Sequence, residues 1–468
     1  MADSFDVVIL GSGPAGYVAA IRAGEAGLKT ALVEKEKRLG GTCLHWGCIP
    51  TKAMLFSAQL LDHAHDAEAF GLKIPSAEAD IEKVHAYKGG VVTKMANGID
   101  FLMKKNKVTV FSGHGRITGP GKVTVTPATG APQPLEARNI IVATGSATKS
   151  LPGLDFDGTH ILSSDHILNI QKIPKKMAVL GGGAVGVEFA SVFRSFGSEV
   201  TIIEVMPNLL PLEDEDCGKQ LARSFRKRKI EVLTASKLEK LERVKDGVKL
   251  TVASVDGKTQ VIEADFLLSA VGRRPLTEDV GLDKIGLKPD ARGYLAVDGM
   301  MRTSVPGVFA IGDVVAGTPM LAHVGSAEGI VAVGFIAGKN PQPLNYDQMP
   351  SCTYCTPQVA TVGLSEKKAK ERGLDVKTGV FPFSALGKAT ILRETEGFVK
   401  IVFDKKYNEV LGIHMVGPEV TDLLAEGGLA LRLESTLEEI ARTVHAHPTL
   451  SEAIGEAAHV ALGEPIHV

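Results

Sequence analysis

Runs of consecutive apolar residues, several of them followed by glycine-rich turns, recur along most of the chain. "FDVVIL" starts at Phe5, "NIIVA" at Asn139, "FLLSAV" at Phe266 and "GVFAIG" at Gly307. Apolar runs without polar alternation are typical of strands that are covered by helices on both faces of a parallel sheet. The pattern therefore predicts an α/β fold for the first three quarters of the chain.

The pattern changes from about Tyr346. "GFVKIVFDKKYNEVLGIHMVG" contains two alternating runs joined by the turn-forming stretch "KKYNEV", and further helical segments follow. This order predicts an antiparallel sheet with helices, which is a separate α+β domain. We expect four parts: a dinucleotide-binding domain at 1–147, a second one at 148–275, a central segment at 276–345 that completes the first, and a C-terminal domain at 346–468.

One segment of the chain occurs twice. Each copy has an apolar strand, the sequence G-x-G-x-x-G, a helix of small residues and a second apolar strand that ends in Glu. The glycines and the glutamate that ends each copy are Gly11, Gly13, Gly16 and Glu34, and then Gly181, Gly183, Gly186 and Glu204. A single glycine motif is a weak signal. Two copies, each between a strand and a helix and each with its acidic residue, predict two Rossmann-like dinucleotide sites.

The chemistry of a dinucleotide explains each part of this motif. The first glycine permits a tight turn, the second lets the backbone approach a pyrophosphate, and the third allows close helix–strand packing. The helix N-terminus adds N–H donors and a partial positive charge, and the glutamate accepts hydrogen bonds from ribose hydroxyls. "VMPNLL" after Glu204 contains no Arg or Lys to neutralise a 2′-phosphate, so NAD is favoured over NADP at the second site.

Composition narrows the function classes. The 468 residues carry a formal net charge of -2, which provides no electrostatic case for a nucleic acid or an anionic membrane as partner. No apolar stretch reaches the roughly 20 residues of a membrane span. The first strand begins at Phe5, leaving no room for a leader peptide, so a cytoplasmic protein is expected. Five cysteines in a chain of this length do not indicate a secreted disulfide framework.

The stretch "GGTCLHWGCIPTK" places Cys43 and Cys48 directly after the first nucleotide motif. Three interpretations compete. A zinc site would need a second pair, which Cys352 and Cys355 in "SCTYCTPQ" could supply, although we expect those two to be packing residues. Inert core thiols are disfavoured by the surrounding glycines and Pro50. A redox pair fits best, because a helix beginning near Pro50 would stabilise a Cys48 thiolate and a flavin in the first site could accept its electrons.

The paired nucleotide motifs, "GGTCxxxGCIPTK", "ATGS", "GRRP", "AIGD" and "HAHPTLSE" together resemble the FAD-dependent pyridine nucleotide–disulfide oxidoreductases. Within that family the chain is most similar to the branch that oxidises dihydrolipoyl groups. The resemblance covers essentially the whole chain. It implies a C-terminal dimerisation domain, an obligate homodimer, and a lipoylated acyltransferase or carrier protein of a multienzyme complex as partner.

The resemblance also implies roles for single residues. Cys43 would attack on the substrate side, Cys48 would lie beside the flavin, and the charge of Lys52 would stabilise reduced flavin. Residues implied at the FAD site besides the first glycine loop are Glu34, Thr42, Gly115, Ala143, Thr144, Gly145, Ser146, Asp313 and Ala322. Residues implied around NAD besides the second loop are Glu204, Leu238 and Gly272. No metal site is expected.

His447 and Glu452 in "HAHPTLSE" match a base held by a carboxylate, but spacing alone leaves His445 as a competitor. The resemblance selects His447 with Glu452 and implies that they reach the disulfide of the other subunit. The alternatives are another disulfide or metal-ion reductase of the same family and, from a different class, a redox sensor or scaffold. A catalytic base distinguishes an enzyme from a redox sensor, because a sensor does not need one.

Overall fold

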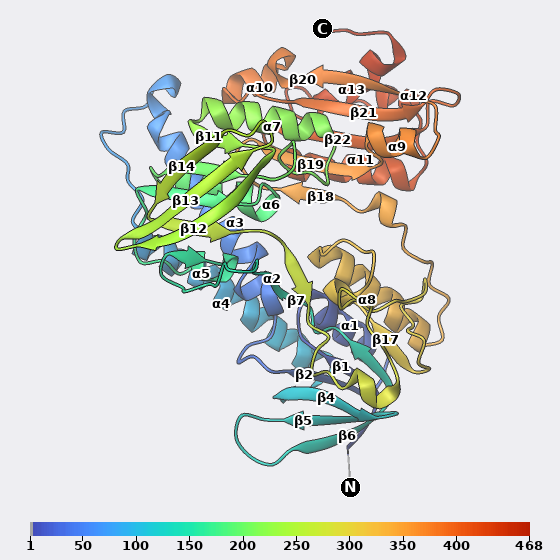
Figure 1. The fold of residues 1–468 in the computed structure, drawn as a ribbon. Coiled ribbons are helices and arrows are strands. Elements are labelled where there is room, and N and C mark those ends of the chain that lie inside the picture. Colours follow the sequence, from blue (N-terminus) through green and yellow to red (C-terminus); the bar gives the residue numbers. More distant parts are fainter. Residues whose placement is uncertain (1–2) are drawn as a thin grey trace. The chain divides into compact units, whose positions relative to one another are not determined.

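The computed structural model describes residues 3–468, which divide into two compact units. Unit 1 contains the described residues through Ala53, together with His85–Lys149 and Gly272–Tyr346. Unit 2 contains Met54–Val84, Ser150–Val271 and Asp347–Val468. This division does not test the four predicted domain boundaries, which stay predictions. Figure 1 shows the elements of both units with the labels used below.

The sheet of unit 1 contains the first buried strands that the apolar pattern predicted. Its order is β3-β2-β1-β6-β5-β4, and β17 also pairs with β6. The pairs of β1 with β2 and β6, of β2 with β3 and of β6 with β17 are parallel, whereas β4, β5 and β6 pair antiparallel. The strands are β1 (Asp3–Leu10), β2 (Thr30–Glu34), β3 (Thr109–Ser112), β4 (His114–Gly119), β5 (Lys122–Thr126), β6 (Gln133–Val142) and β17 (Val308–Ala310).

Helix α1 (Pro14–Glu25) packs closely against helix α8 (Ala322–Ile336) because both present small residues. A Cβ at Gly325 would lie 3.0 Å from the Cβ of Ala15, and one at Gly329 would lie 2.9 Å from its carbonyl oxygen. Unit 1 further contains α2 (Gly41–His45), β7 (Ser146–Thr148), β16 (Arg273–Pro275), η2 (Leu282–Ile285), η3 (Gly312–Val314) and the start of η4 (Tyr346–Gln348). Helices α3 (Cys48–His65) and α4 (Ile81–Lys105) contribute residues to both units.

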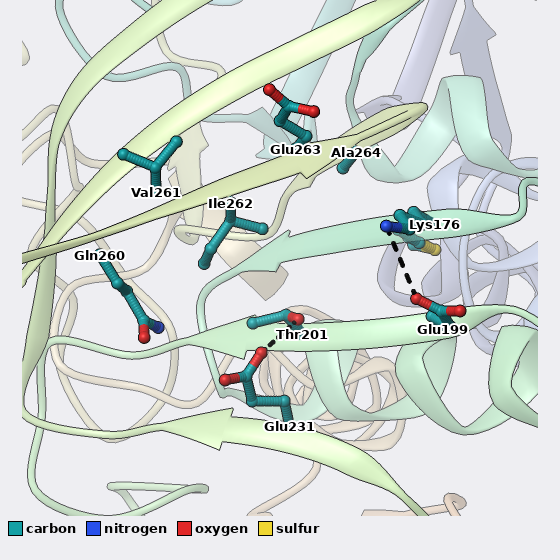
Figure 2. Close-up of a pocket in the computed structure, with 10 residues that line it drawn as sticks. Lys176, Glu199, Thr201, Glu231, Gln260, Val261, Ile262, Glu263 and Ala264 are labelled. Carbon is teal, nitrogen blue, oxygen red and sulfur yellow. Dashed lines mark hydrogen bonds and ion pairs between the residues drawn. The ribbon is translucent and has the colours of Figure 1, made fainter.

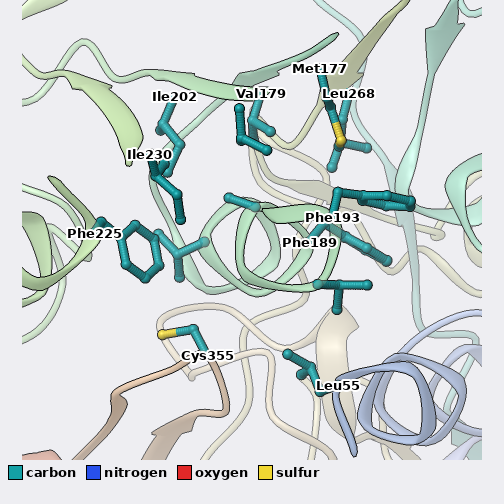
Figure 3. Packing of buried hydrophobic residues seen from close by; sticks show 14 of the residues in the cluster. Leu55, Met177, Val179, Phe189, Phe193, Ile202, Phe225, Ile230, Leu268 and Cys355 are labelled. Carbon is teal, nitrogen blue, oxygen red and sulfur yellow. The ribbon is translucent and has the colours of Figure 1, made fainter. Parts of the chain in front are cut away.

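Unit 2 contains the second parallel sheet, in the order β11-β10-β9-β15-β8. Helix α6 (Ala184–Ser195) is buried along most of its length and forms the centre of this core, as Figure 3 shows for Phe189 and Phe193. Other members of this part are β8 (Ile161–Leu162), α5 (Ser164–Ile167), β9 (Lys176–Leu180), β10 (Glu199–Ile203), α7 (Glu215–Lys227), β11 (Ile230–Leu233), β15 (Phe266–Ser269) and η1 (Ala67–Phe70). An antiparallel sheet of β12 (Ser236–Val244), β13 (Gly247–Ser254) and β14 (Thr259–Ala264) precedes β15.

The C-terminal part of unit 2 is the predicted antiparallel sheet with helices, in the order β18-β19-β22-β21-β20. The "KKYNEV" stretch joins β21 to β22, and Asn408 within it has a positive φ of 56°. The elements are β18 (Ser351–Thr353), β19 (Gln358–Gly363), α9 (Glu366–Glu371), β20 (Val376–Pro382), η5 (Phe383–Ala385), α10 (Gly387–Leu392), β21 (Phe398–Asp404), β22 (Val410–Gly417), α11 (Val420–Arg432), α12 (Leu437–Arg442) and α13 (Glu452–Leu462). The fold is therefore mixed α/β with a C-terminal α+β domain, as the sequence predicts.

Candidate active site

The first glycine loop joins β1 to α1. Gly11 has a φ of +103°, and a Cβ there would lie 2.3 Å from the carbonyl oxygen of Ala143. A Cβ at Gly16 would lie 1.9 Å from the carbonyl oxygen of Gly11, so this glycine is required for helix–strand packing. A Cβ at Gly13 would meet nothing within 4 Å, so the packing of the protein does not explain this glycine. The open space in front of the N-terminus of α1 fits a pyrophosphate, because the helix has no side-chain cap there.

The second glycine loop repeats this geometry between β9 and α6. Gly181 has a φ of +108°, with Ala270 in the place of Ala143, and a Cβ at Gly186 would again lie 1.9 Å from the carbonyl oxygen of Gly181. Gly183 caps α6 without a side-chain hydrogen bond, and a Cβ there would meet nothing within 4 Å. The sequence repeat is therefore also a repeat in three dimensions, with the same open position.

The two predicted ribose-binding glutamates are buried and held by backbone donors of their own loops. Glu34 ends β2, and its Oε2 accepts from the Ser12 N–H at 2.8 Å and from the Ser12 hydroxyl at 2.6 Å. Glu204 follows β10 and accepts from the N–H groups of Gly182 at 2.6 Å and Met206 at 2.7 Å. These bonds orient both carboxylates at the carboxyl ends of parallel strands, and they leave lone pairs for a diol.

Three segments that are distant in the sequence meet in unit 1 beside the first glycine loop. The Ser146 hydroxyl donates to the Asp313 carboxylate and accepts from Arg273 Nε at 2.7 Å. The Thr144 hydroxyl donates to the carbonyl oxygen of Leu276 at 2.5 Å. The "ATGS", "GRRP" and "AIGD" motifs thus form one hydrogen-bonded group, which the sequence predicts only as separate motifs.

Other predicted cofactor residues lie near the glycine loops. A Cβ at Gly115 would touch Leu10 at 2.8 Å and Val33 at 2.9 Å, so Gly115 lies over the ends of β1 and β2. Leu238 packs on the cluster that contains the last residues of β9 and β10. Gly272 belongs to unit 1, where its carbonyl accepts from the N–H of Lys149, and its role toward NAD stays a prediction. Ala322 begins α8, which has no side-chain cap.

The cysteine motif is attached to the first glycine loop. The N–H of Gly40 donates to the carbonyl oxygen of Ser12 at 3.0 Å, and a Cβ at Gly41 would lie 2.6 Å from the Cα of Gly13. Both Gly40 and Gly41 have positive φ, which lets the chain turn sharply into α2. The motif therefore lies next to the position where the loop has room for a pyrophosphate.

Cys43 and Cys48 are reduced thiols whose side chains hydrogen bond to each other. Cys43 lies on α2, and Cys48 is the first residue of α3, where the helix field stabilises a thiolate. The hydrogen bond to Cys48 and burial raise the pKa of the Cys43 thiol, although the charge of Lys52 opposes this. The thiol of Cys43 is therefore harder to ionise than an ordinary cysteine thiol.

The structure also explains the "LHW" between the cysteines. His45 Nε2 lies 2.9 Å from the carbonyl oxygen of Leu39, which fixes the loop before α2. Trp46 ends α2 through its N–H, which donates to Thr42 O at 2.8 Å, and its ring lies 5.4 Å from that of His45. Sequence reasoning missed Tyr17 on α1. Burial raises the pKa of Tyr17 and Cys43 adds to this, so this hydroxyl lies near the thiol pair.

The C-terminal loop contains two imidazole–carboxylate pairs, which differ in exposure. His447 Nδ1 lies 2.9 Å from Glu452 Oε1, and the His447 side chain is 77% exposed. His445 Nε2 lies 2.8 Å from Glu426 Oε1, and that side chain is only 10% exposed. His445 is thus enclosed with its own carboxylate. Of these two histidines, His447 is the one whose ring is exposed to solvent, and its role as the base stays a prediction.

Hydrogen bonds fix the Glu452 carboxylate beside the ring of His447. The N–H of Thr449 donates to Oε2 of Glu452 at 2.8 Å. Burial pushes the pKa of Glu452 upward, but the bonds from Thr449 and His447 outweigh it and hold the pKa below its ordinary value. Glu452 is therefore ionised at neutral pH and can stabilise a protonated His447.

Cys352 and Cys355 lie in different cores. Cys355 is fully buried in the cluster around α6, and Figure 3 shows it on the side of the helix away from Val179 and Ile202. Cys352 packs against the cluster of the C-terminal sheet. No disulfide joins the two sulfurs, and their role as packing residues stays a prediction. Within residues 3–468 no group of three or more His, Cys, Asp or Glu residues is arranged to hold a metal ion.

A cavity of about 250 Å³ lies in unit 2 at the amino ends of strands β9 and β10 of the second parallel sheet (Figure 2). It is lined by the first residues of β9 and β10 and by β14, and an ion pair joins Lys176 to Glu199 at 3.9 Å. Nucleotides bind at the carboxyl ends of parallel strands, and these are the amino ends. This cavity is therefore separate from the candidate nucleotide site at Gly183 and Glu204.

The chain is similar to known proteins along almost its whole length. Residues 5–329 match the family model described as pyridine nucleotide-disulphide oxidoreductase, and residues 349–458 match its dimerisation domain. The chain is 47% identical over 468 residues to dihydrolipoyl dehydrogenase of Zymomonas mobilis, covering 100% of both chains. It is 44% identical to dihydrolipoyl dehydrogenase of Bacillus subtilis, again with 100% of both covered. Its fold is similar to the crystal structure of LpdA from Mycobacterium tuberculosis, with a TM-score of 0.90, 27% identity and coverage of 98% and 99%. No helix within residues 3–468 has both the length and the apolar character needed to cross a bilayer.

Proposed function

The chain belongs to the pyridine nucleotide–disulphide oxidoreductase family, and on that premise we propose that it oxidises dihydrolipoyl groups and reduces NAD⁺. The observation that carries this proposal is the hydrogen-bonded pair of Cys43 and Cys48, which is attached to a glycine loop with an open position at Gly13. A disulfide exchanges with a dithiol substrate, and the nucleotide sites supply the electron acceptors. The relatives named dihydrolipoyl dehydrogenase over their full length support the substrate class.

The first site fits FAD. The N-terminus of α1 would hold the pyrophosphate, Glu34 would hold the ribose, and the Ser146–Asp313 group would line the rest of the site. When bound there, FAD would take the electron pair of the dithiol and pass it to NAD⁺. Lys52 is close enough to act on the pKa of Cys43, so its positive charge lies beside the redox pair.

The cysteines carry out the exchange with the substrate. In the oxidised enzyme they form a disulfide. His447 takes the proton of one dihydrolipoyl thiol, and the resulting thiolate attacks the Cys43 sulfur and displaces Cys48 as a thiolate. The second dihydrolipoyl thiol then attacks the mixed disulfide, which releases oxidised lipoyl and leaves Cys43 as a thiol. Each round transfers two electrons from the substrate dithiol to the cysteine pair.

The proton acceptor is set up by Glu452. Because His447 Nδ1 is bonded to Glu452, the Nε2 nitrogen is left to take a proton from the substrate. The ionised carboxylate then stabilises the imidazolium that forms. We propose that each active site uses the His447–Glu452 pair of the other subunit. The match of residues 349–458 to a dimerisation domain supports a homodimer.

The second site is proposed to prefer NAD. The carboxylate of Glu204, fixed by the N–H groups of Gly182 and Met206, would accept from the ribose and repel a 2′-phosphate. The proposed partner is a lipoylated acyltransferase or carrier protein of a multienzyme complex, and the proposed location is the cytoplasm.

The test is a steady-state comparison of purified holoenzyme with free dihydrolipoamide or glutathione and with NAD⁺ or NADP⁺. The proposal predicts turnover with dihydrolipoamide and NAD⁺ that exceeds each of the other combinations at least tenfold in kcat/KM. A preference for glutathione with the NADP couple would instead identify a different disulfide reductase of the family. A flavoprotein that binds FAD but turns over neither dithiol would favour the sensor alternative.

A further inference from the structure

Glu328 is a fully buried carboxyl group that the proposed mechanism does not use. It lies on α8, and its relative exposure is 0%. Its Oε2 accepts from the N–H of Gly312 at 2.5 Å, and its Oε1 accepts from the hydroxyl of Tyr346 at 2.9 Å. The side chain of Thr318 also hydrogen bonds to it. Three hydrogen-bond partners therefore fix the position of this buried carboxyl group.

The Gly312 N–H that Glu328 binds belongs to the turn that also carries Asp313, a residue of the proposed FAD site. Gly312 has a φ of +73°, and a Cβ there would lie 3.1 Å from the Cβ of Ala15, in the first turn of α1. Asp313 follows directly and accepts from the Ser146 hydroxyl. Figure 1 shows α8 beside α1, in agreement with their close packing. Glu328 therefore lies directly behind the turn that presents Asp313, where α8 packs against the first nucleotide loop.

Opposing effects act on the pKa of the Glu328 carboxyl group. Burial raises its pKa to about 7, with Asp313 adding to the increase, while the bonds from Gly312 and Tyr346 lower it. The titratable groups that act on it are Asp313 on η3 and Tyr346 on η4, and α1 packs against this part of α8 through Ala15 and Ala19. Burial and Glu328 also raise the pKa of Tyr346, so this hydroxyl remains a donor. Near neutral pH the Glu328 carboxyl is thus partly protonated.

We propose that Glu328 is a positioning residue for the Gly312–Asp313 turn and that its proton controls how tightly the enzyme retains its flavin. The inference rests on the proposed function, in which Asp313 lines the FAD site. An ionised Glu328 adds a negative charge next to Asp313 and near a cofactor that carries two phosphate charges. Bound FAD therefore favours the protonated carboxyl, and by linkage flavin is held more weakly as the pH rises and the proton is lost.

The experiment measures release of flavin from holoenzyme without any substrate. Flavin fluorescence is followed after dilution at constant mild heating, at several values between pH 6 and pH 8.5. For the wild type, release accelerates with pH, approaching at most the roughly tenfold per pH unit that one proton allows. In Glu328→Gln the amide keeps an acceptor for Gly312 and a donor toward the Tyr346 oxygen. Release from this variant should change less than twofold over the same range.

Two further variants separate charge from packing. Glu328→Ala leaves the Gly312 N–H without its acceptor and should release flavin faster at every pH. Tyr346→Phe removes a hydrogen bond that favours the ionised carboxyl, so its release profile should shift to higher pH. Matching pH profiles for the wild type and Glu328→Gln would overturn the inference and leave the proposed function intact. A chain that purifies without FAD would contradict both.

Discussion

His447 and Glu452 meet at 2.9 Å between Nδ1 and Oε1, although a proline and a turn separate them in the sequence. The N–H of Thr449 holds the other carboxylate oxygen at 2.8 Å, so the pair is preorganised before any substrate arrives. His447 is 77% exposed, whereas the neighbouring His445 is enclosed with Glu426. This difference in exposure predicts which histidine takes the proton of the substrate.

Replacing His447 by Gln should lower kcat for dihydrolipoamide oxidation by roughly 10²–10⁴, which is the usual contribution of a general base. His445→Gln is the matched control. This variant loses the buried hydrogen bond to Glu426 but keeps His447 as the base. We therefore expect its melting temperature to fall while its kcat stays near the wild-type value. A loss below fivefold for His447→Gln would show that another group accepts the proton.

The second nucleotide loop allows binding and packing to be separated. Gly186→Ala should reduce stability by about 1–3 kcal/mol, because its Cβ would collide with Gly181 O at 1.9 Å. Gly183→Ala should leave the melting temperature unchanged, since its Cβ meets nothing within 4 Å, but it should raise KM for NAD⁺ at least tenfold. Differential scanning calorimetry and steady-state kinetics on both variants check this. An unchanged KM in Gly183→Ala would mean that the open position does not receive a pyrophosphate.

Nucleotide preference should depend on the charge of Glu204. Glu204→Gln keeps the shape of the side chain but removes the charge that repels a 2′-phosphate. We expect the kcat/KM ratio of NAD⁺ to NADP⁺ to fall by roughly tenfold to a hundredfold, the scale of a hydrogen bond to a charged group. Glu199→Gln is the control, because Glu199 begins β10, the strand that Glu204 follows, and lines the cavity at its amino end. An equal effect of both substitutions would contradict a specific role of Glu204.

Acid stability should depend on His414, which is buried on β22. Burial lowers the pKa of His414, and its Nε2 lies 3.0 Å from the carbonyl oxygen of Leu364, with Asp214 and Lys400 acting on its charge. The unfolded chain takes up a proton near the ordinary histidine pKa of about 6.5, whereas the folded chain takes it up only at a lower pH. Stability is therefore present at neutral pH and lost as the pH falls through this range. The decrease in melting temperature between pH 8 and pH 5 should be smaller in His414→Gln. Equal decreases would assign acid lability to other groups.

The sequence predicts the parts of this site that repeat or that have a strict motif. The offset between Gly11 and Gly181 predicts both nucleotide loops, and the structure shows the tight turn and the helix–strand packing expected at the first and third glycines of each loop. Apolar runs predict the strands because buried parallel strands lack polar alternation. Spacing could not decide between His445 and His447. What distinguishes them is that His445 is enclosed and paired with Glu426, a residue of helix α11 that the spacing of the motif does not reveal.

Residues that act behind the site are harder to find from sequence. Arg273 was visible within "GRRP", but its bond to Ser146 depends on the antiparallel pairing of β16 with β7. Glu328 gave a signal that could have been used, because it is the one acidic residue in the apolar helix "AHVGSAEGIVAVGFI". A buried charge in such a helix requires partners, and only the structure identifies them as Gly312 and Tyr346.

The central claim is that electrons enter the enzyme through Cys43. The most direct measurement is the rate of dihydrolipoamide-dependent NAD⁺ reduction by Cys43→Ser, with flavin content determined on the same sample. Cys352→Ser serves as the control, because that cysteine packs against the C-terminal sheet and lies outside the Cys43–Cys48 pair. We predict that Cys43→Ser keeps its FAD and loses turnover, while Cys352→Ser retains both. Turnover near the wild-type rate in Cys43→Ser would contradict the disulfide mechanism.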